Sequence, residues 1–242
     1  MVAPPDNDVI WARALHHAHN GSPALAGVSL GVRKGEVLAV CGPRGSGKTT
    51  LLRCLSGQTL ADEGEVWFDG SPVHTLPALQ RERLRRDHFA WIGPEPGLVP
   101  ELTAWENTAL PLLLRGTSRR SAKATALEWL ERLDIGHLAR HRPHALNQAQ
   151  RQRTTAARAL AATPGVLFAD EPTASLHRSD HAHLLRTVLA AARSHRVTVV
   201  LATHDPEVAA LADRTAVLVD GRRVTSLSDT APEGRAECSL SV

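Results

Sequence analysis

Several residue types are scarce in this chain, and each scarcity narrows the classes of protein to which it can belong. The 242 residues include no Tyr and only 3% aromatic side chains, so Leu, Val and Ala must supply most of the core packing. The 3 cysteines are odd in number and lack metal-ligand spacing, which suits a reducing compartment and free thiols. No run approaches the roughly 18 apolar residues that a membrane-spanning helix needs. We therefore expect any membrane association to depend on a partner.

The N-terminal stretch and the charge balance argue against two further classes. The first ten residues, MVAPPDNDVI, lack the basic region and apolar run of a secretory signal peptide, so none is expected. The net charge is only +3, and the densest basic run, RERLRRDH at 81–88, has no aromatic residues on which bases could stack. We therefore expect a solvated basic surface and no nucleic-acid partner.

Strand and helix patterns alternate along most of the chain. Apolar runs within 35–42, 163–172 and 197–206 each end in Gly or polar residues and precede a helical pattern. Strands that alternate with helices predict an α/β fold with a mainly parallel sheet covered on both faces. The dipeptides Asp69-Gly70 and Asp220-Gly221 are hairpin-turn signals, which add a smaller antiparallel part.

The strand patterns disappear between about 101 and 160, where helical signals take over. Thr103 and Glu106 have the spacing of a capping box at a helix start. One face of a later helix is expected to carry Leu127, Leu130 and Leu133.

These patterns predict the domain organisation. We expect one domain over 8–225, with a helical insert at about 95–160. The segment 226–242 is rich in Ser, Ala and charged residues, and we expect it to be unstructured.

The most informative segment is GPRGSGKT at 42–49, which matches Gly-x-x-x-x-Gly-Lys-Thr between a predicted strand and a predicted helix. Glycines let successive backbone N–H groups curl around a phosphate, and the helix start adds its positive end. Lys48 can reach the β- and γ-phosphates, and the Thr49 hydroxyl can bind Mg²⁺. The segment therefore predicts nucleoside triphosphate binding. The residues expected at the nucleotide are Gly42, Pro43, Arg44, Gly45, Ser46, Gly47, Lys48, Thr49 and Thr50.

Polar residues follow two further predicted strands. Asp170 ends one strand and is expected to hold Mg²⁺, usually through a water, while Glu171 can accept a proton from the attacking water. His204 ends another and can contact the γ-phosphate. Such residues are usually solvated or structural, but their order after a phosphate loop favours the functional interpretation.

With these groups in place, the chain resembles the ATP-binding subunits of ABC transporters over about residues 8–225. The likeness is to the branch that serves macrolide export, lipoprotein release and cell division. A P-loop kinase or GTPase, the alternative, has no reason to carry the segment 144–160. The runs that carry the likeness are ALAGVSLGVRKGEVLAVCGPRGSGKTTLL, ELTAWENTALPLLLRG, HRPHALNQAQRQRTTAARAL, FADEPTASL and ATHDPEVAALADRTAVLVDGR.

The resemblance implies an ATPase of the P-loop class with ATP and Mg²⁺ as ligands. It also implies a membrane permease as partner, a cytoplasmic position on the inner face of the cell membrane, and a head-to-tail dimer. In such a dimer, the signature helix of one subunit caps the ATP of the other. The family signature is Leu-Ser-Gly-Gly-Gln, and here Leu146 and Gln150 match while the centre reads Asn147, Gln148 and Ala149. We interpret this segment as a signature helix with an altered tip.

Other positions depart from the family pattern as well. The glutamine expected after the strand before the helical insert aligns with Pro94, beside Glu95. The acidic residue of the loop after Glu171 aligns with His177. The aromatic residue that stacks on adenine aligns with His19, whose imidazole offers less stacking area than Tyr.

Two functions therefore remain open at this point. In the first, the chain is an ATPase that drives a permease, with Glu171 as base and with Lys48 and His204 stabilising transferred charge. In the second, it is a regulatory or structural subunit that binds ATP and hydrolyses it slowly or not at all. A heterodimer with a second ABC ATPase reconciles the two functions, and a homodimer is the alternative.

Overall fold

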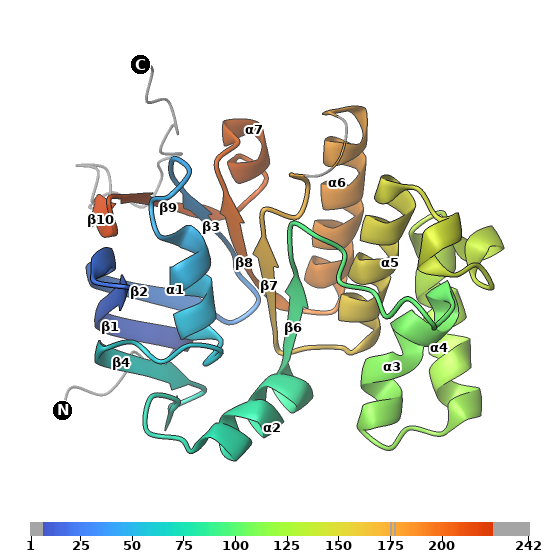
Figure 1. The fold of residues 1–242 in the computed structure, drawn as a ribbon, viewed down its shortest axis with the longest axis horizontal. Coiled ribbons are helices and arrows are strands. Elements are labelled where there is room, and N and C mark those ends of the chain that lie inside the picture. The colour runs from blue at the N-terminus through green and yellow to red at the C-terminus, as the bar shows by residue number, and fades with distance from the viewer. Residues whose placement is uncertain (1–6, 175, 177, 225–242) are drawn as a thin grey trace. The chain divides into compact units, whose positions relative to one another are not determined.

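The computed structural model describes residues 7–224 except 175 and 177, and also leaves out the side chains of 178–180. The chain divides into two compact units, one of residues 1–85 and 198–242 and one of residues 86–197 (Figure 1). The predicted terminal segment 226–242 and His177 lie outside the described residues.

The first unit contains a mainly parallel sheet with fully buried central strands. Strands β3 and β8 are buried along their whole length, as expected for apolar runs covered on both faces. Strand β3 lies between β8 and β9 and is parallel to both, while β10 pairs with β9 in antiparallel orientation. The bounds are β3 Val37–Cys41, β8 Thr198–Thr203, β9 Arg214–Val219 and β10 Arg222–Val224.

The same unit holds an antiparallel sheet in the order β2-β1-β4-β5. Helix α1 contacts β8 as well as β1, β2 and β4, so it lies between the two sheets (Figure 1). The bounds are β1 Asp8–His19, β2 Ser22–Arg33, β4 Glu63–Phe68, β5 Ser71–Pro72, α1 Lys48–Leu55 and α7 Pro206–Ala209. Helix α2, Ala78–His88, has no buried residue and contains the boundary between the units.

Both predicted hairpin turns are confirmed. Asp69 and Gly70 have φ of 47° and 74° between β4 and β5, and Asp220 and Gly221 have φ of 47° and 71° between β9 and β10. Two successive residues with positive φ match the twist of antiparallel strands, which explains the Asp-Gly pairs.

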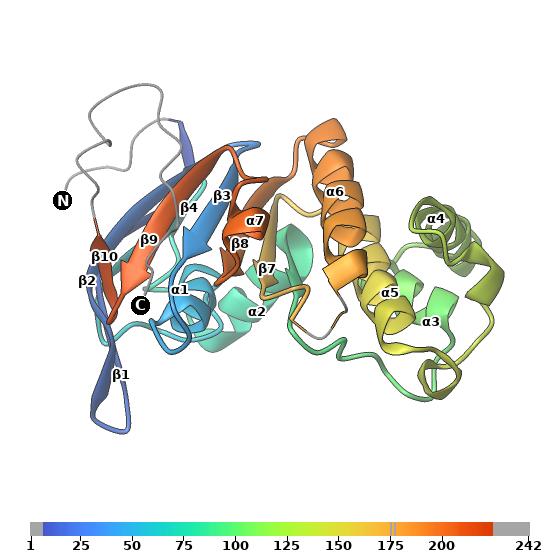
Figure 2. The ribbon, with the colours of Figure 1, turned by 90° about the horizontal axis from the view of Figure 1, so that it is seen from above.

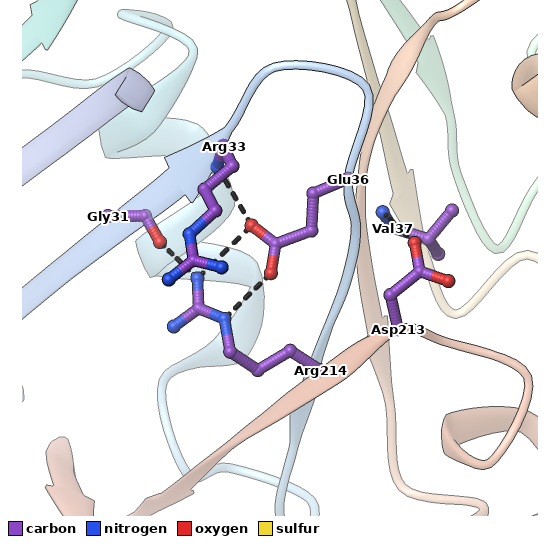
Figure 3. A network of polar contacts seen from close by, with 6 residues as sticks. All are labelled: Gly31, Arg33, Glu36, Val37, Asp213 and Arg214. Atoms are coloured by element: carbon purple, nitrogen blue, oxygen red, sulfur yellow. Dashed lines mark hydrogen bonds and ion pairs between the residues drawn. The ribbon is translucent and has the colours of Figure 1, made fainter. Parts of the chain in front are cut away.

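An ion pair joins the start of β3 to the start of β9 (Figure 3). Arg214 donates from Nε to Glu36 Oε1 at 2.7 Å and from a terminal nitrogen to the carbonyl oxygen of Gly31 at 2.5 Å. The Glu36 side chain is only 10% exposed and also accepts from the Arg33 backbone N–H. Burial raises the pKa of the neighbouring Asp8 carboxyl, and the charge of Arg214 partly opposes that rise.

Replacing Arg214 with Met should lower the free energy of unfolding by about 2 kcal/mol, because Glu36 would keep its charge without its charged partner. Urea denaturation measures the change. Arg222→Met is the matched control, since Arg222 is exposed on β10 and its loss should cost less than about 0.5 kcal/mol. Equal urea midpoints for the two variants would contradict the structural role of the pair.

The second unit combines two parallel strands, β6 and β7, with four helices. Helices α3, α4 and α5 pack against one another, and α5 also contacts α6 and β6 (Figures 1 and 2). No strand lies between β6 and β7 along residues 93–165, all of which the structure describes. The bounds are β6 Phe89–Ile92, β7 Val166–Asp170, α3 Ala104–Leu114, α4 Arg119–Arg132, α5 Gln148–Ala161 and α6 Arg178–Ser194, with short 3₁₀ turns at Gly136–Leu138 and Pro143–Ala145.

The predicted capping box at the start of α3 is confirmed. The Thr103 backbone N–H donates to Glu106 Oε2 at 3.0 Å, and the Glu106 N–H donates to Thr103 Oγ1 at 3.4 Å. Hydrogen bonds from the Thr103 hydroxyl and backbone hold the pKa of Glu106 below its usual value.

The predicted apolar face of the later helix is only partly correct. Leu130 and Leu133 are buried, but the Leu127 side chain is 36% exposed. The buried face of α4 instead follows the i, i+4, i+7, i+8 spacing of a helix. Its members are Ala122, Ala126, Trp129 and Leu130. Among the described residues, no helix is long and apolar enough to cross a membrane.

Candidate nucleotide site

The glycine-rich loop lies between the end of β3 and the start of α1, as predicted. Gly45 and Gly47 have φ of 81° and 98°, which side chains rarely adopt. A Cβ at Gly47 would clash with the carbonyl oxygen of Ala24, and one at Gly42 would clash with that of Leu218. The loop therefore requires glycine both for its backbone conformation and for its close approach to neighbouring strands.

The polar groups of this loop suit an anionic ligand. The Lys48 side chain is buried, and its Nζ donates to the carbonyl oxygens of Gly42 and Pro43 at 2.8 Å each, so the ammonium is held against the loop. Ser46 Oγ is also buried and has no hydrogen-bond partner within the described part of the chain. Helix α1 begins at Lys48, and its N-cap residue Gly47 has no side chain to cap it, whereas Thr103, Ser118 and Asn147 cap α3, α4 and α5. These features fit a bound phosphate.

His19 and His204 both lie close to this loop in the first unit. His19 Nε2 is 3.1 Å from Thr50 Oγ1, so the imidazole at the end of β1 contacts the third residue of α1. His204 is exposed and directly follows β8. Cys41 and Thr203 pair in the parallel ladder, so the loop and His204 leave neighbouring strands at the same end.

The acidic pair lies at the end of β7 in the second unit. Asp170 is the last residue of the strand and is 4% exposed, and Glu171 is half-buried. Glu171 has φ of 45°, which is rare for a residue with a side chain. Ile92 pairs with Ala169, so the exposed Pro94 and Glu95 follow the neighbouring strand at the same end.

The altered signature tip begins α5 with a complete capping box. Asn147 Oδ1 accepts from the Gln150 N–H at 2.9 Å, and the Asn147 N–H donates to Gln150 Oε1 at 2.9 Å. Gln148 and Ala149 are the first two helical residues and have no positive φ, so their backbone does not require glycine. Asn147 and Gln148 are exposed. The substitutions therefore change which groups the tip presents and leave the start of the helix intact.

Gln152, which belongs to no motif recognised in the sequence, lies in a buried polar cluster. Its side chain is fully buried, and Nε2 donates to the carbonyl oxygens of Gly93 and Pro172 at 2.8 Å each. The sequence feature that could have identified it is a long polar side chain among the Ala and Thr residues that form the buried side of α5.

The fold and the loop together define an α/β protein of the P-loop nucleotide-binding class. A family model described as ABC transporter matches residues 25–174. The chain belongs to the ABC transporter family, which confirms the predicted resemblance and fold class.

The relatives agree with this assignment. The chain is 39% identical over 198 residues to the uncharacterized ABC transporter ATP-binding protein YbbA of Escherichia coli K12. The aligned residues cover 82% of this chain and 87% of the relative. It is 37% identical over 213 residues to the lipoprotein-releasing system ATP-binding protein LolD of Paramagnetospirillum magneticum, covering 86% and 92% of the two chains. The dimeric ATP-binding cassette MJ0796, solved with ADP and Pi, matches with a TM-score of 0.83 and 31% identity over 88% of this chain and 96% of that one.

The chain is thus the ATP-binding component of an ABC transporter. Proteins of this family are ATPases coupled to transport, and they work with membrane permease subunits.

Proposed function

We propose that this chain binds MgATP through residues 42–50 and hydrolyses it to drive or gate a membrane permease. The observation that carries the proposal is the loop itself, in which a buried lysine, a buried hydroxyl and an uncapped helix start converge. The contact between His19 and Thr50 supports a place for the adenine ring beside α1. Mg²⁺ would be held by Thr49 and, usually through a water, by Asp170.

Each residue then has a distinct chemical role. Lys48 neutralises charge on the β- and γ-phosphates, and His204 donates to the γ-phosphate. Glu171 takes a proton from the attacking water, because a carboxylate beside the reacting phosphate is the available base. The metal ion supplies electrostatic stabilisation of the transferred phosphoryl group.

The dimeric state of MJ0796 supports a dimer of this chain, and the family resemblance implies a head-to-tail arrangement for it. In that arrangement, Asn147, Gln148, Ala149 and Gln150 cap the ATP of the partner cassette, which is a second copy or a different ABC ATPase. We place the chain in the cytoplasm, held at the inner face of the cell membrane by its permease.

A regulatory subunit with slow hydrolysis is the second candidate. The observation that favours it is the set of departures at Pro94 and at 147–149, where the family has residues that contact the metal and the γ-phosphate. A heterodimer would allow an intact signature from the partner to cap the ATP bound by this chain.

Replacing Lys48 with Ala should weaken MgATP binding by roughly 1.5–3 kcal/mol, because a charge-assisted contact to the phosphates is lost. Isothermal titration calorimetry of both proteins measures the difference. Lys34→Ala is the matched control, since Lys34 is exposed and precedes β3, whereas the loop follows it. Equal affinities for wild type and Lys48→Ala would rule out the loop as the nucleotide site.

A further inference from the structure

Three side chains of α5 hold the segment that follows β6. Gln152 donates to the carbonyl oxygen of Gly93 at 2.8 Å, and Thr155 Oγ1 donates to that of Pro96 at 2.6 Å. Arg158 donates to the carbonyl oxygens of Pro96 and Gly97 at 3.3 and 2.9 Å. The spacing i, i+3, i+6 places the three on one side of the helix, along which the segment from β6 to α3 runs (Figures 1 and 2).

Gln152 differs from the other two because it also reaches the segment after β7. The second hydrogen on Nε2 is donated to the carbonyl oxygen of Pro172 at 2.8 Å. Two carbonyl acceptors determine the orientation of the amide, since the opposite orientation would set Oε1 against both oxygens. Gln152 therefore joins α5 to the two backbone segments that follow β6 and β7 at the same end of the pair.

The residue before Pro172 is the proposed base, and its backbone is strained. Glu171 has φ of 45°, a backbone conformation that residues with a side chain rarely adopt. Such a conformation persists only where the surroundings hold it. Besides the bond from Gln152, the turn is closed by the Ala174 N–H, which donates to the carbonyl oxygen of Glu171 at 3.0 Å.

The carbonyl oxygen of the Gln152 side chain indicates that this position requires the hydrogen bonds that Nε2 donates. Oε1 is buried and accepts no hydrogen bond from the described residues. An apolar side chain of similar size would fill the same space without leaving a buried acceptor unmet.

We propose that Gln152 is a positioning residue, which holds the turn 171–174 in the conformation that presents Glu171 to the attacking water. This inference rests on the proposed role of Glu171 as base. Its other bond, to the carbonyl oxygen of Gly93, holds the amide in the orientation that donates to Pro172. Gln152 does not contact the nucleotide in this role and acts through the backbone of its neighbours.

The test compares Gln152→Met with Thr155→Val, since both remove a bond to the segment 93–97 but only the first removes the bond to Pro172. Amide hydrogen exchange, followed by mass spectrometry, should be about tenfold faster over 171–174 in Gln152→Met and unchanged there in Thr155→Val. A peptide from β3 reports global unfolding and should exchange equally in all three proteins. Equal exchange over 171–174 in wild type and Gln152→Met overturns the inference.

Kinetics separate this inference from the proposed function. Gln152→Met should lower kcat roughly tenfold to a hundredfold with little change in KM for ATP, because the base is displaced while the phosphate loop is untouched. In a Glu171→Gln background, the same substitution should lower turnover no further. Additive losses would overturn the positioning role, whereas unchanged turnover in Glu171→Gln alone would overturn the proposed base and leave the exchange result to decide on Gln152.

Discussion

Replacing Glu171 with Gln should leave MgATP bound and lower hydrolysis by about a hundredfold or more. The amide keeps the shape of the carboxylate but cannot accept a proton from water, and a general base contributes on the order of 10²–10⁴ in rate. The phosphate loop is unaltered by the change, so affinity measured by calorimetry should stay within about twofold of wild type.

The measurement is phosphate release at saturating ATP, with Glu128→Gln as the matched control. Glu128 is exposed on α4 in the same unit and pairs with Arg132, and exposed pairs of this kind contribute little. The control should turn over ATP at the wild-type rate. If Glu171→Gln turned over ATP as fast as the control, the general base would have to be another residue.

Restoring Ser-Gly-Gly at 147–149 should raise ATP turnover of the isolated protein by about tenfold or more. In a homodimer, each ATP would meet the altered tip, and losing one well-placed donor to a developing phosphoryl charge costs on the order of 10²–10³ in rate. Adding Pro94→Gln to the restored chain should raise turnover again, because in the proposed site both positions would serve the same γ-phosphate and metal. The rates to compare are those of wild type, the triple variant and the quadruple variant.

The structure adds a control that separates chemistry from folding. Asn147 already caps α5, and Ser caps about as well, so Asn147→Ser alone should leave thermal stability unchanged. Glycine at positions 148 and 149 should instead lower stability, by up to about 1 kcal/mol each. A rise in turnover together with a fall in stability would therefore show that the new groups act on the bound ATP, and that the gain does not come from a more stable helix.

Two other outcomes would distinguish the altered-tip account from its alternatives. Identical low rates in wild type, triple and quadruple variants would contradict the altered-tip account and favour a regulatory subunit. A high wild-type rate that neither restoration exceeds would show that Leu-Asn-Gln-Ala-Gln works as it stands.

Elements with a local cause were predictable from the sequence. The buried runs of β3, β7 and β8, the Asp-Gly turns and the capping box at Thr103 each depend on residues a few positions apart. The glycine-rich loop belongs with them, because its backbone conformation and its junction of strand and helix are properties of one short segment. The exposure of Leu127 was missed because a spacing of three alone did not identify the buried side of α4.

The contacts between residues far apart in the sequence came only from the tertiary structure. The bond between His19 and Thr50 spans 31 positions, the hold of Gln152 on Gly93 spans 59, and the pair of Arg214 with Glu36 spans 178. No local propensity encodes such a pairing, because each partner alone is compatible with an ordinary exposed polar residue. For Gln152 and Glu36 the pairings are favoured by burial, since packing the strands and helices removes water from these side chains and leaves them to find partners within the protein.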